Sequence, residues 1–103
     1  MIVYNVTCNV TPEIEKPWLK WIDHQLYNLS KSEKISATSI LKLNTNGSEN
    51  EAVYALQYHI YNRDSLQSFL NNEDQVLKKQ INTVFGESVL HFSSQLEIIK
   101  KYP

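Results

Sequence analysis

Residues 52–62 read AVYALQYHIYN, and this run decides the fold of the chain. Alternate residues of a strand point to opposite faces of a sheet. One face therefore carries Ala52, Tyr54, Leu56, Tyr58 and Ile60, and the other carries Val53, Ala55, Gln57, His59 and Tyr61. Neither face holds a carboxylate or a lysine, which is typical of a central strand that is covered on both sides. We predict a strand over Ala52–Asn62 in the middle of a sheet.

The length and charge of the chain limit the partners it can have. With 103 residues it can bury one hydrophobic core, so we expect a single domain over residues 1–103. Ten Lys and Arg residues and eleven Asp and Glu residues give a net charge of −1. Proteins that bind nucleic acid or anionic membranes usually carry a clear positive excess. We expect neither partner here.

Sequence features that would direct export are missing from the start of the chain. Met1-Ile2-Val3-Tyr4 lacks the basic residues and the long apolar run of a signal peptide, and no apolar stretch approaches membrane-spanning length. Cys8 is the only cysteine and lies in an apolar strand pattern, which favours a buried thiol over a nucleophile. We expect a cytoplasmic protein without an intrachain disulfide.

The first strand and helix are predicted from residue periodicity and proline positions. Ile2–Val10 alternates apolar residues with β-branched and polar ones, as a half-buried strand does. Two prolines then limit where a helix can begin, because Pro12 suits a first turn whereas Pro17 would clash with a helix already under way. We therefore expect a turn at Pro12–Lys16 and a helix from about Pro17.

The next two strands are predicted to form a hairpin. Ile35–Leu43 alternates like a strand, and its Lys42 is typical of a sheet edge, where a charge prevents unwanted pairing. Asn46-Gly47 favours the two-residue turn that joins antiparallel strands. We expect residues 35–43 to pair with residues 52–62.

A second helix and a fourth strand complete the chain. Asn62 is positioned to cap the helix, whose apolar residues recur at three- and four-residue spacings until Gly86 stops it. The polar run Asn71–Gln75 is expected to divide this helix into two pieces. Ser88–Ile98 alternates again and is predicted to be the last strand.

The order strand, helix, strand, strand, helix, strand predicts a ferredoxin-like α+β sandwich. Right-handed crossovers place the first and third strands at the centre of a four-stranded antiparallel sheet, with both helices on one face. We expect the more apolar face of each strand to meet the helices. The opposite face, here called the open face, is then predicted to carry Asn5, Thr7, Asn9, Gln57, His59, Tyr61, His91, Ser93 and Gln95.

An open face of this composition needs a cover, because it is too apolar for solvent and too polar for a dry core. A second copy of the chain, a small ligand or single-stranded nucleic acid could cover it. RNA-recognition modules of this element order need a basic residue and a glycine that Glu51–Tyr58 lacks, which disfavours nucleic acid. We expect a homodimer whose paired faces enclose a partly polar cavity.

Several segments resemble a known family. Met1–Val10 (MIVYNVTCNV), Trp18–Trp21 (WLKW), Tyr54–Tyr58 (YALQY) and Phe85–Ile99 (FGESVLHFSSQLEII) are similar to the domain-of-unknown-function family four-two-eight-six. That family is similar to the dimeric α/β barrels, whose ferredoxin-like chains pair sheet to sheet. The resemblance implies a fold and a homodimer but no activity, because the family has no established reaction.

Two histidine segments of that family have no counterpart in this chain. A His-Ile-Pro segment is expected after the first helix, within Leu26–Lys34, and a His-Ala-Pro segment is expected where the chain has Asn72–Gln75. We therefore transfer no role from those histidines.

The candidate residues for function lie on the predicted open face. His59 and His91 are its titratable groups, and neither has a carboxylate near it in sequence that could orient it. Metal-site spacings and glycine-rich phosphate loops are missing, so we expect no metal and no cofactor. The ligand- or dimer-facing candidates are Asn5, Thr7, Gln57, His59, Tyr61 and His91.

Two functions remain open for these candidates. The first is a non-catalytic homodimer that binds a small ligand or serves assembly through its open face. The second is a cofactor-free enzyme of the dimeric α/β-barrel monooxygenase type. We prefer the first, because the sequence shows no activated acid–base pair.

Overall fold

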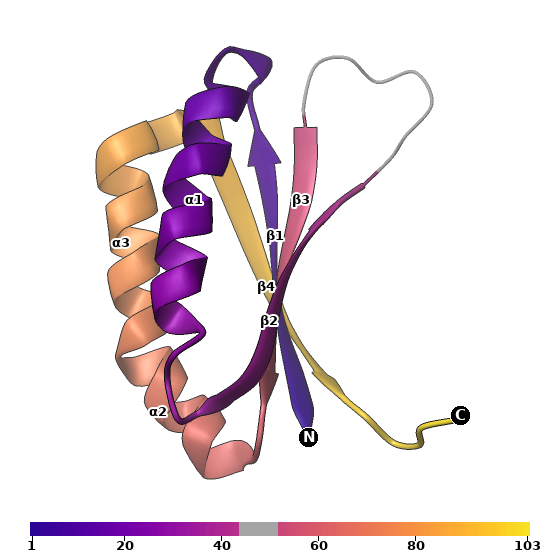
Figure 1. Cartoon of the computed structure of the whole chain (residues 1–103). Coiled ribbons are helices and arrows are strands. Elements are labelled where there is room, and N and C mark those ends of the chain that lie inside the picture. The colour runs from indigo at the N-terminus through magenta and orange to yellow at the C-terminus, as the bar shows by residue number, and fades with distance from the viewer. Residues whose placement is uncertain (44–51) are drawn as a thin grey trace.

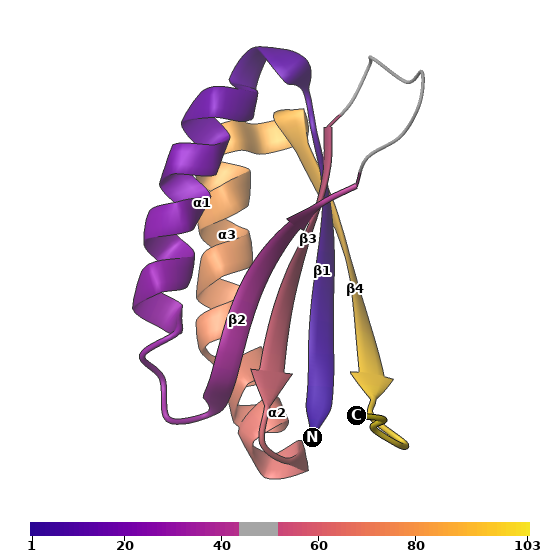
Figure 2. The ribbon, with the colours of Figure 1, turned by 45° about the vertical axis from the view of Figure 1, so that its right-hand side comes forward.

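The computed structural model describes residues 1–43 and 52–103 (Figure 1). Its strands and longer helices are β1 (Ile2–Val10), α1 (Glu15–Leu29), β2 (Ile35–Lys42), β3 (Ala52–Ile60), α2 (Arg63–Asn71), α3 (Glu73–Phe85) and β4 (Val89–Glu97). The sheet has the order β2-β3-β1-β4, and all neighbouring strands are antiparallel. The helices cover one face of the sheet (Figures 1 and 2). The predicted ferredoxin-like α+β sandwich is confirmed.

The hydrophobic core lies between the sheet and the helices. Every second residue of β1 is buried, and β3 shows the same alternation, as predicted from the run at 52–60. The largest fully buried side chains of the core are Trp18, Tyr4, Tyr58, Phe69, Ile22 and Leu56. Removing these apolar surfaces from water stabilises the layers by roughly 25 cal/mol per Å². The thiol of Cys8 is buried, as expected.

The first helix begins two residues earlier than predicted. Pro12–Ile14 form a 3₁₀ turn, and α1 runs from Glu15, so Pro17 is its third residue. The amides of a first helical turn have no acceptor within the helix, and the missing N–H of Pro17 therefore costs nothing there. The prediction that the helix begins at about Pro17 is therefore wrong by two residues, because a proline is tolerated in the first helical turn.

The second helical segment is divided where the sequence predicted. α2 ends at Asn71 and α3 begins at Glu73. The side chain of Asn62 accepts a hydrogen bond from the Ser65 amide at 2.8 Å and caps α2, as expected. Gly86 ends α3 with a positive φ of 55°, a backbone region that side chains rarely adopt.

A β-bulge reverses the predicted faces of β2. Ile35 pairs with Ile60, but Ala37 pairs with His59, so Ser36 is an extra residue on this strand. Ile35 faces the helices, whereas the alternate residues after the bulge face the other side: Ala37, Ser39 and Leu41. The prediction that one continuous apolar face of this strand meets the helices is wrong. The predicted turn at Asn46-Gly47 lies outside the described residues, although β2 and β3 do pair antiparallel.

The predicted faces of β4 are also reversed. Val89 pairs with Val10 and His91 pairs with Cys8, which places both on the helix side. The register is fixed by the 3₁₀ turn at Gly86–Ser88, where the Ser88 carbonyl accepts from the Thr11 amide at 3.0 Å. A shift of one residue moves every side chain of a strand to the other face. His91, Ser93 and Gln95 therefore do not lie on the open face, and their apolar neighbours do.

Candidate functional site

The open face has a polar centre on the two middle strands. Asn5 of β1 and Gln57 of β3 are directly opposed, and Gln57 Nε2 donates to Asn5 Oδ1 at 3.3 Å. Asn5 Nδ2 donates in turn to Thr7 Oγ1 at 3.1 Å. His59 follows on β3, opposite Val3. Amide, hydroxyl and imidazole groups are therefore brought together without a carboxylate or a lysine among them.

The β4 edge of the open face is mainly apolar, and the β2 edge is partly so. On β4, Leu90, Phe92 and Leu96 expose 50%, 62% and 51% of their surface. On β2, Leu41 points to the same face and is exposed too. Several large apolar side chains exposed on one face indicate an interaction surface. This arrangement of a polar centre between apolar edges was not predicted, because it depends on the two reversed strands.

The structure places the predicted site residues in three different positions. Asn5, Thr7, Gln57 and His59 lie on the open face, as their pairing register shows. Tyr61 follows the end of β3, and its amide donates to the Lys34 carbonyl at 3.4 Å. His91 was predicted on the open face and instead lies on the helix side of β4.

A shallow hollow of about 310 Å³ marks one end of the open face. It lies where β1, β2 and β3 meet beside Thr7, and apolar side chains including Leu41, Val53 and Ala55 line it. A small apolar group fits a space of this volume and lining. The polar centre around Asn5 and Gln57 is therefore continuous with an apolar recess.

The helix side of the sheet holds a buried ionic cluster that the sequence analysis missed. Tyr4 of β1 donates to Asp74 Oδ2 at 2.9 Å, and Lys78 Nζ lies 3.0 Å from the same oxygen. Lys78 Nζ also donates to Tyr4 Oη at 2.7 Å and to Ser93 Oγ at 2.6 Å. Asp74 is 4% exposed, which is uncommon for a carboxylate. Two donors reach its Oδ2, and its Oδ1 has no hydrogen-bond partner among the described residues.

The cluster changes the proton affinity of its members. Burial opposes the charge of Lys78, but the hydrogen bonds with Tyr4 and Asp74 outweigh this and raise the pKa of Lys78. Burial also raises the pKa of Tyr4. Burial and the positive charge of Lys78 lower the pKa of His91 on neighbouring β4. Lys78 is thus held charged and Tyr4 is held neutral. The ion pair of Asp74 and Lys78 on α3 is joined to the sheet through the hydroxyl group of Tyr4.

A sequence signal for this cluster did exist. Asp74 precedes Lys78 by four residues, a spacing that places two side chains on one face of a helix. Leu77 and Ile81 on the same helix are buried, so that face points towards the core. We predicted residues 71–75 as a polar break in the helix, and this interpretation missed the pair of Asp74 and Lys78.

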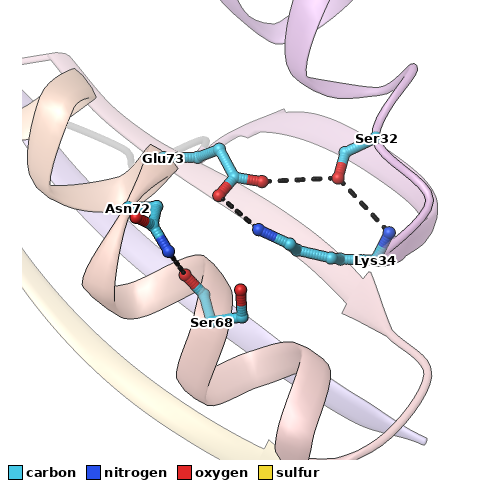
Figure 3. Close-up of polar contacts among 5 residues, drawn as sticks. All are labelled: Ser32, Lys34, Ser68, Asn72 and Glu73. Atoms are coloured by element: carbon cyan, nitrogen blue, oxygen red, sulfur yellow. Dashed lines mark hydrogen bonds and ion pairs between the residues drawn. The ribbon is translucent and has the colours of Figure 1, made fainter.

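A second hollow, of about 440 Å³, lies between α1 and the α2–α3 pair. Amide side chains line much of it, including Gln25, Asn72 and Gln80. Figure 3 shows that polar groups at this junction are already paired within the chain. Glu73 accepts from Lys34 Nζ at 2.7 Å, and Asn72 Nδ2 donates to the Ser68 carbonyl at 2.8 Å. The contact with Lys34 joins the junction of α2 and α3 to the segment before β2, and the contact with Ser68 closes the junction itself, so we assign this region a structural role.

Within residues 1–43 and 52–103, no group of three or more His, Cys, Asp or Glu side chains is arranged to hold a metal ion. The same described residues contain no helix that is long and apolar enough to span a membrane.

Comparison with known sequences identifies a family. Residues 1–99 match the sequence profile of the domain of unknown function DUF4286. No curated protein matches the chain.

Comparison with solved structures gives the same fold. A Deinococcus radiodurans protein, provisionally assigned as an antibiotic biosynthesis monooxygenase, has a TM-score of 0.75 at 10% identity, covering 100% of this chain and 97% of its own. A dimeric ferredoxin-like protein from an uncultured marine organism has a TM-score of 0.67 at 10% identity, with 98% and 97% covered. The heme-degrading MhuD of Mycobacterium tuberculosis, with two hemes in its active site, has a TM-score of 0.62 at 14% identity, with 98% and 99% covered. At these identities the likeness establishes the fold.

Proposed function

The chain belongs to the family DUF4286, whose function is unknown, so we propose a function from the site itself. We propose a non-catalytic homodimer that pairs its open faces and binds a small molecule between them. The observation that carries this proposal is the exposed apolar edge of β4, formed by Leu90, Phe92 and Leu96. In a two-fold dimer the same face of each copy meets its partner, so each copy can cover the apolar edge of the other. The dimeric ferredoxin-like protein of the same fold supports a dimer.

The polar centre suggests the class of ligand. Hydrogen bonds among Asn5, Thr7 and Gln57 leave further amide and hydroxyl capacity on the open face, and His59 adds an imidazole. Apolar side chains surround these groups, as they do in small-molecule sites. We propose a ligand with an apolar body and a few neutral hydrogen-bonding groups. The binding of hemes by MhuD supports a small-molecule role for this fold.

The solution mass tests the dimer. Sedimentation from nanomolar to high micromolar concentration should show a dimer that Phe92→Glu converts to a monomer, since each copy would bury a charge in the interface. Val84→Glu is the matched control, because Val84 is similarly exposed but lies on α3, on the opposite side of the sheet from the open face. Native mass spectrometry of the dimer would detect a retained ligand as mass beyond two chains. A wild-type monomer throughout the concentration range would exclude the proposed function.

A cofactor-free oxygenase is the second candidate function. The position of His59 on the open face favours it. Among the described strand residues on the open face, His59 is the one titratable side chain. An imidazole can remove a proton from a phenol or enol, whose anion reacts with oxygen. Oxygen uptake with a panel of phenols tests this function. Uptake that His59→Ala abolishes would support an enzyme, and uptake that survives this substitution would not.

A further inference from the structure

The residues after β4 carry apolar side chains that the rest of the described chain does not cover. Ile98 is the last residue held by the sheet, because its amide donates to the Met1 carbonyl at 3.3 Å. Beyond it, Ile99 and Tyr102 expose 96% and 74% of their surface. Lys100 Nζ lies 5.1 Å from the centre of the Tyr102 ring, which is a contact within this segment itself. We call residues 99–103 the arm.

The arm leaves the sheet on the side away from the helices (Figure 1). This is the side of the open face, where Leu90, Phe92 and Leu96 of β4 are exposed. Strand alternation places Ile98 on the same face as Leu96. The apolar edge of the open face therefore continues along β4 into the arm.

We propose that the arm packs on a second copy of the chain. This inference rests on the proposed sheet-to-sheet dimer and adds a specific contact to it. A two-fold dimer makes every such contact twice, so each chain would both extend an arm and receive one. The arm lies on the side that the second copy would occupy, and it is continuous with the apolar edge that this copy would cover. A second copy is therefore favoured over an unrelated partner.

The composition of the arm suits this role. Ile99 supplies an aliphatic side chain, and Tyr102 supplies a large ring with a polar tip, the combination that is enriched at protein interfaces. Lys100 and Lys101 can stay in water at the rim while their stems cover apolar surface. The arm as defined has five residues, which limits the chain entropy lost when it becomes fixed.

Truncation tests the arm directly. A chain that ends at Ile98 keeps the last sheet hydrogen bond, and we expect its dimer dissociation constant to rise at least tenfold. The double variant Ile99→Ser with Tyr102→Ser should reproduce the loss. The matched control, Lys100→Ser with Lys101→Ser, changes the same segment but keeps its apolar side chains, so its dissociation constant should stay near that of the wild type. Thermal unfolding of the truncated monomer should be unchanged, because every residue of the arm is exposed.

Limited proteolysis supplies a second measurement. Trypsin cleaves after Lys101 and releases Tyr102-Pro103, which mass spectrometry detects. This cleavage should be slow in the wild-type dimer and fast in the Phe92→Glu monomer. Equal dissociation constants for the full and truncated chains would overturn the arm contact and leave the dimer standing. A full chain that stays monomeric would overturn both proposals.

Discussion

Tyr4 of β1 donates a hydrogen bond to Asp74 of α3 at 2.9 Å, although the two residues are 70 positions apart in the chain. The same carboxylate oxygen lies 3.0 Å from Lys78 Nζ. Helix α3 is thus held on the central strand by a buried polar contact as well as by apolar packing. Because buried polar groups are costly unless they are paired, the three residues should behave as one unit when any of them is changed.

Breaking this ion pair should destabilise the fold. Asp74→Asn keeps an acceptor for Tyr4 but leaves the charge of Lys78 without its counter-ion. We expect a loss of about 2–3 kcal/mol, below the roughly 3–5 kcal/mol of a fully buried pair, because Lys78 is partly exposed. Lys78→Met should cost more, since it leaves the nearly inaccessible charge of Asp74 with a hydrogen bond from Tyr4 but without a counter-ion. Urea unfolding of the variants measures both.

The neighbouring residue supplies the control for this prediction. Glu73 forms an ion pair with Lys34 at 2.7 Å, but both side chains are partly exposed to solvent. Pairs of this kind contribute about 0–1 kcal/mol, so Glu73→Gln should have little effect. If Asp74→Asn and Glu73→Gln cost the same, the buried cluster would have no special role in stability.

Leu56→Ala should show that the helix side of β3 is the core. Leu56 is fully buried at the centre of the sheet, and removing three of its carbons leaves a cavity. We expect unfolding to become easier by about 2–5 kcal/mol. Val76→Ala removes methyl groups from an exposed position on α3 and should be nearly neutral. Similar melting temperatures for Leu56→Ala and the wild type would contradict this prediction.

His91 should make stability depend on pH. Burial and the charge of Lys78 lower the pKa of His91 in the folded chain, whereas the unfolded residue keeps an ordinary pKa near 6.5. Between these two values the unfolded state binds more protons, so stability falls as the pH drops below about 6.5. Urea unfolding between about pH 7 and 5 should show a smaller loss for His91→Gln than for the wild type. Identical slopes would show that His91 titrates alike in both states.

Gln57→Glu tests the open face. Gln57 donates to Asn5, so a carboxylate there would lose this hydrogen bond and place two like charges near the two-fold axis of the proposed dimer. We expect the dissociation constant to rise more than the stability of the monomer falls. Gln80→Glu, which adds the same charge to the exposed surface of α3, should leave association unchanged. A dimer of Gln57→Glu that persists at nanomolar concentration would exclude this placement.

Periodicity predicted the elements well, because burial of alternate residues on central strands is a local pattern. It placed β1, β3 and the division between α2 and α3 to within a few residues, and with them Asn5, Thr7, Gln57 and His59 of the site. It failed on the edge strands. The bulge at Ser36 and the turn at Gly86–Ser88 each shift the register, and a shift of one residue changes which face a side chain occupies.

The sequence by itself determined the order of the elements, the ferredoxin-like fold and the polar centre of the open face, since these depend on local spacing and on the handedness of connections. Only the tertiary structure decided that Phe92 faces outwards while His91 faces the helices. The contact of Tyr4 with Asp74 and Lys78 also depends on the tertiary structure, because residues far apart in the chain meet only when the layers pack. Residues 52–60 lie at the centre of both the hydrophobic core and the open face, because Leu56 points towards the helices and Gln57 towards the open face.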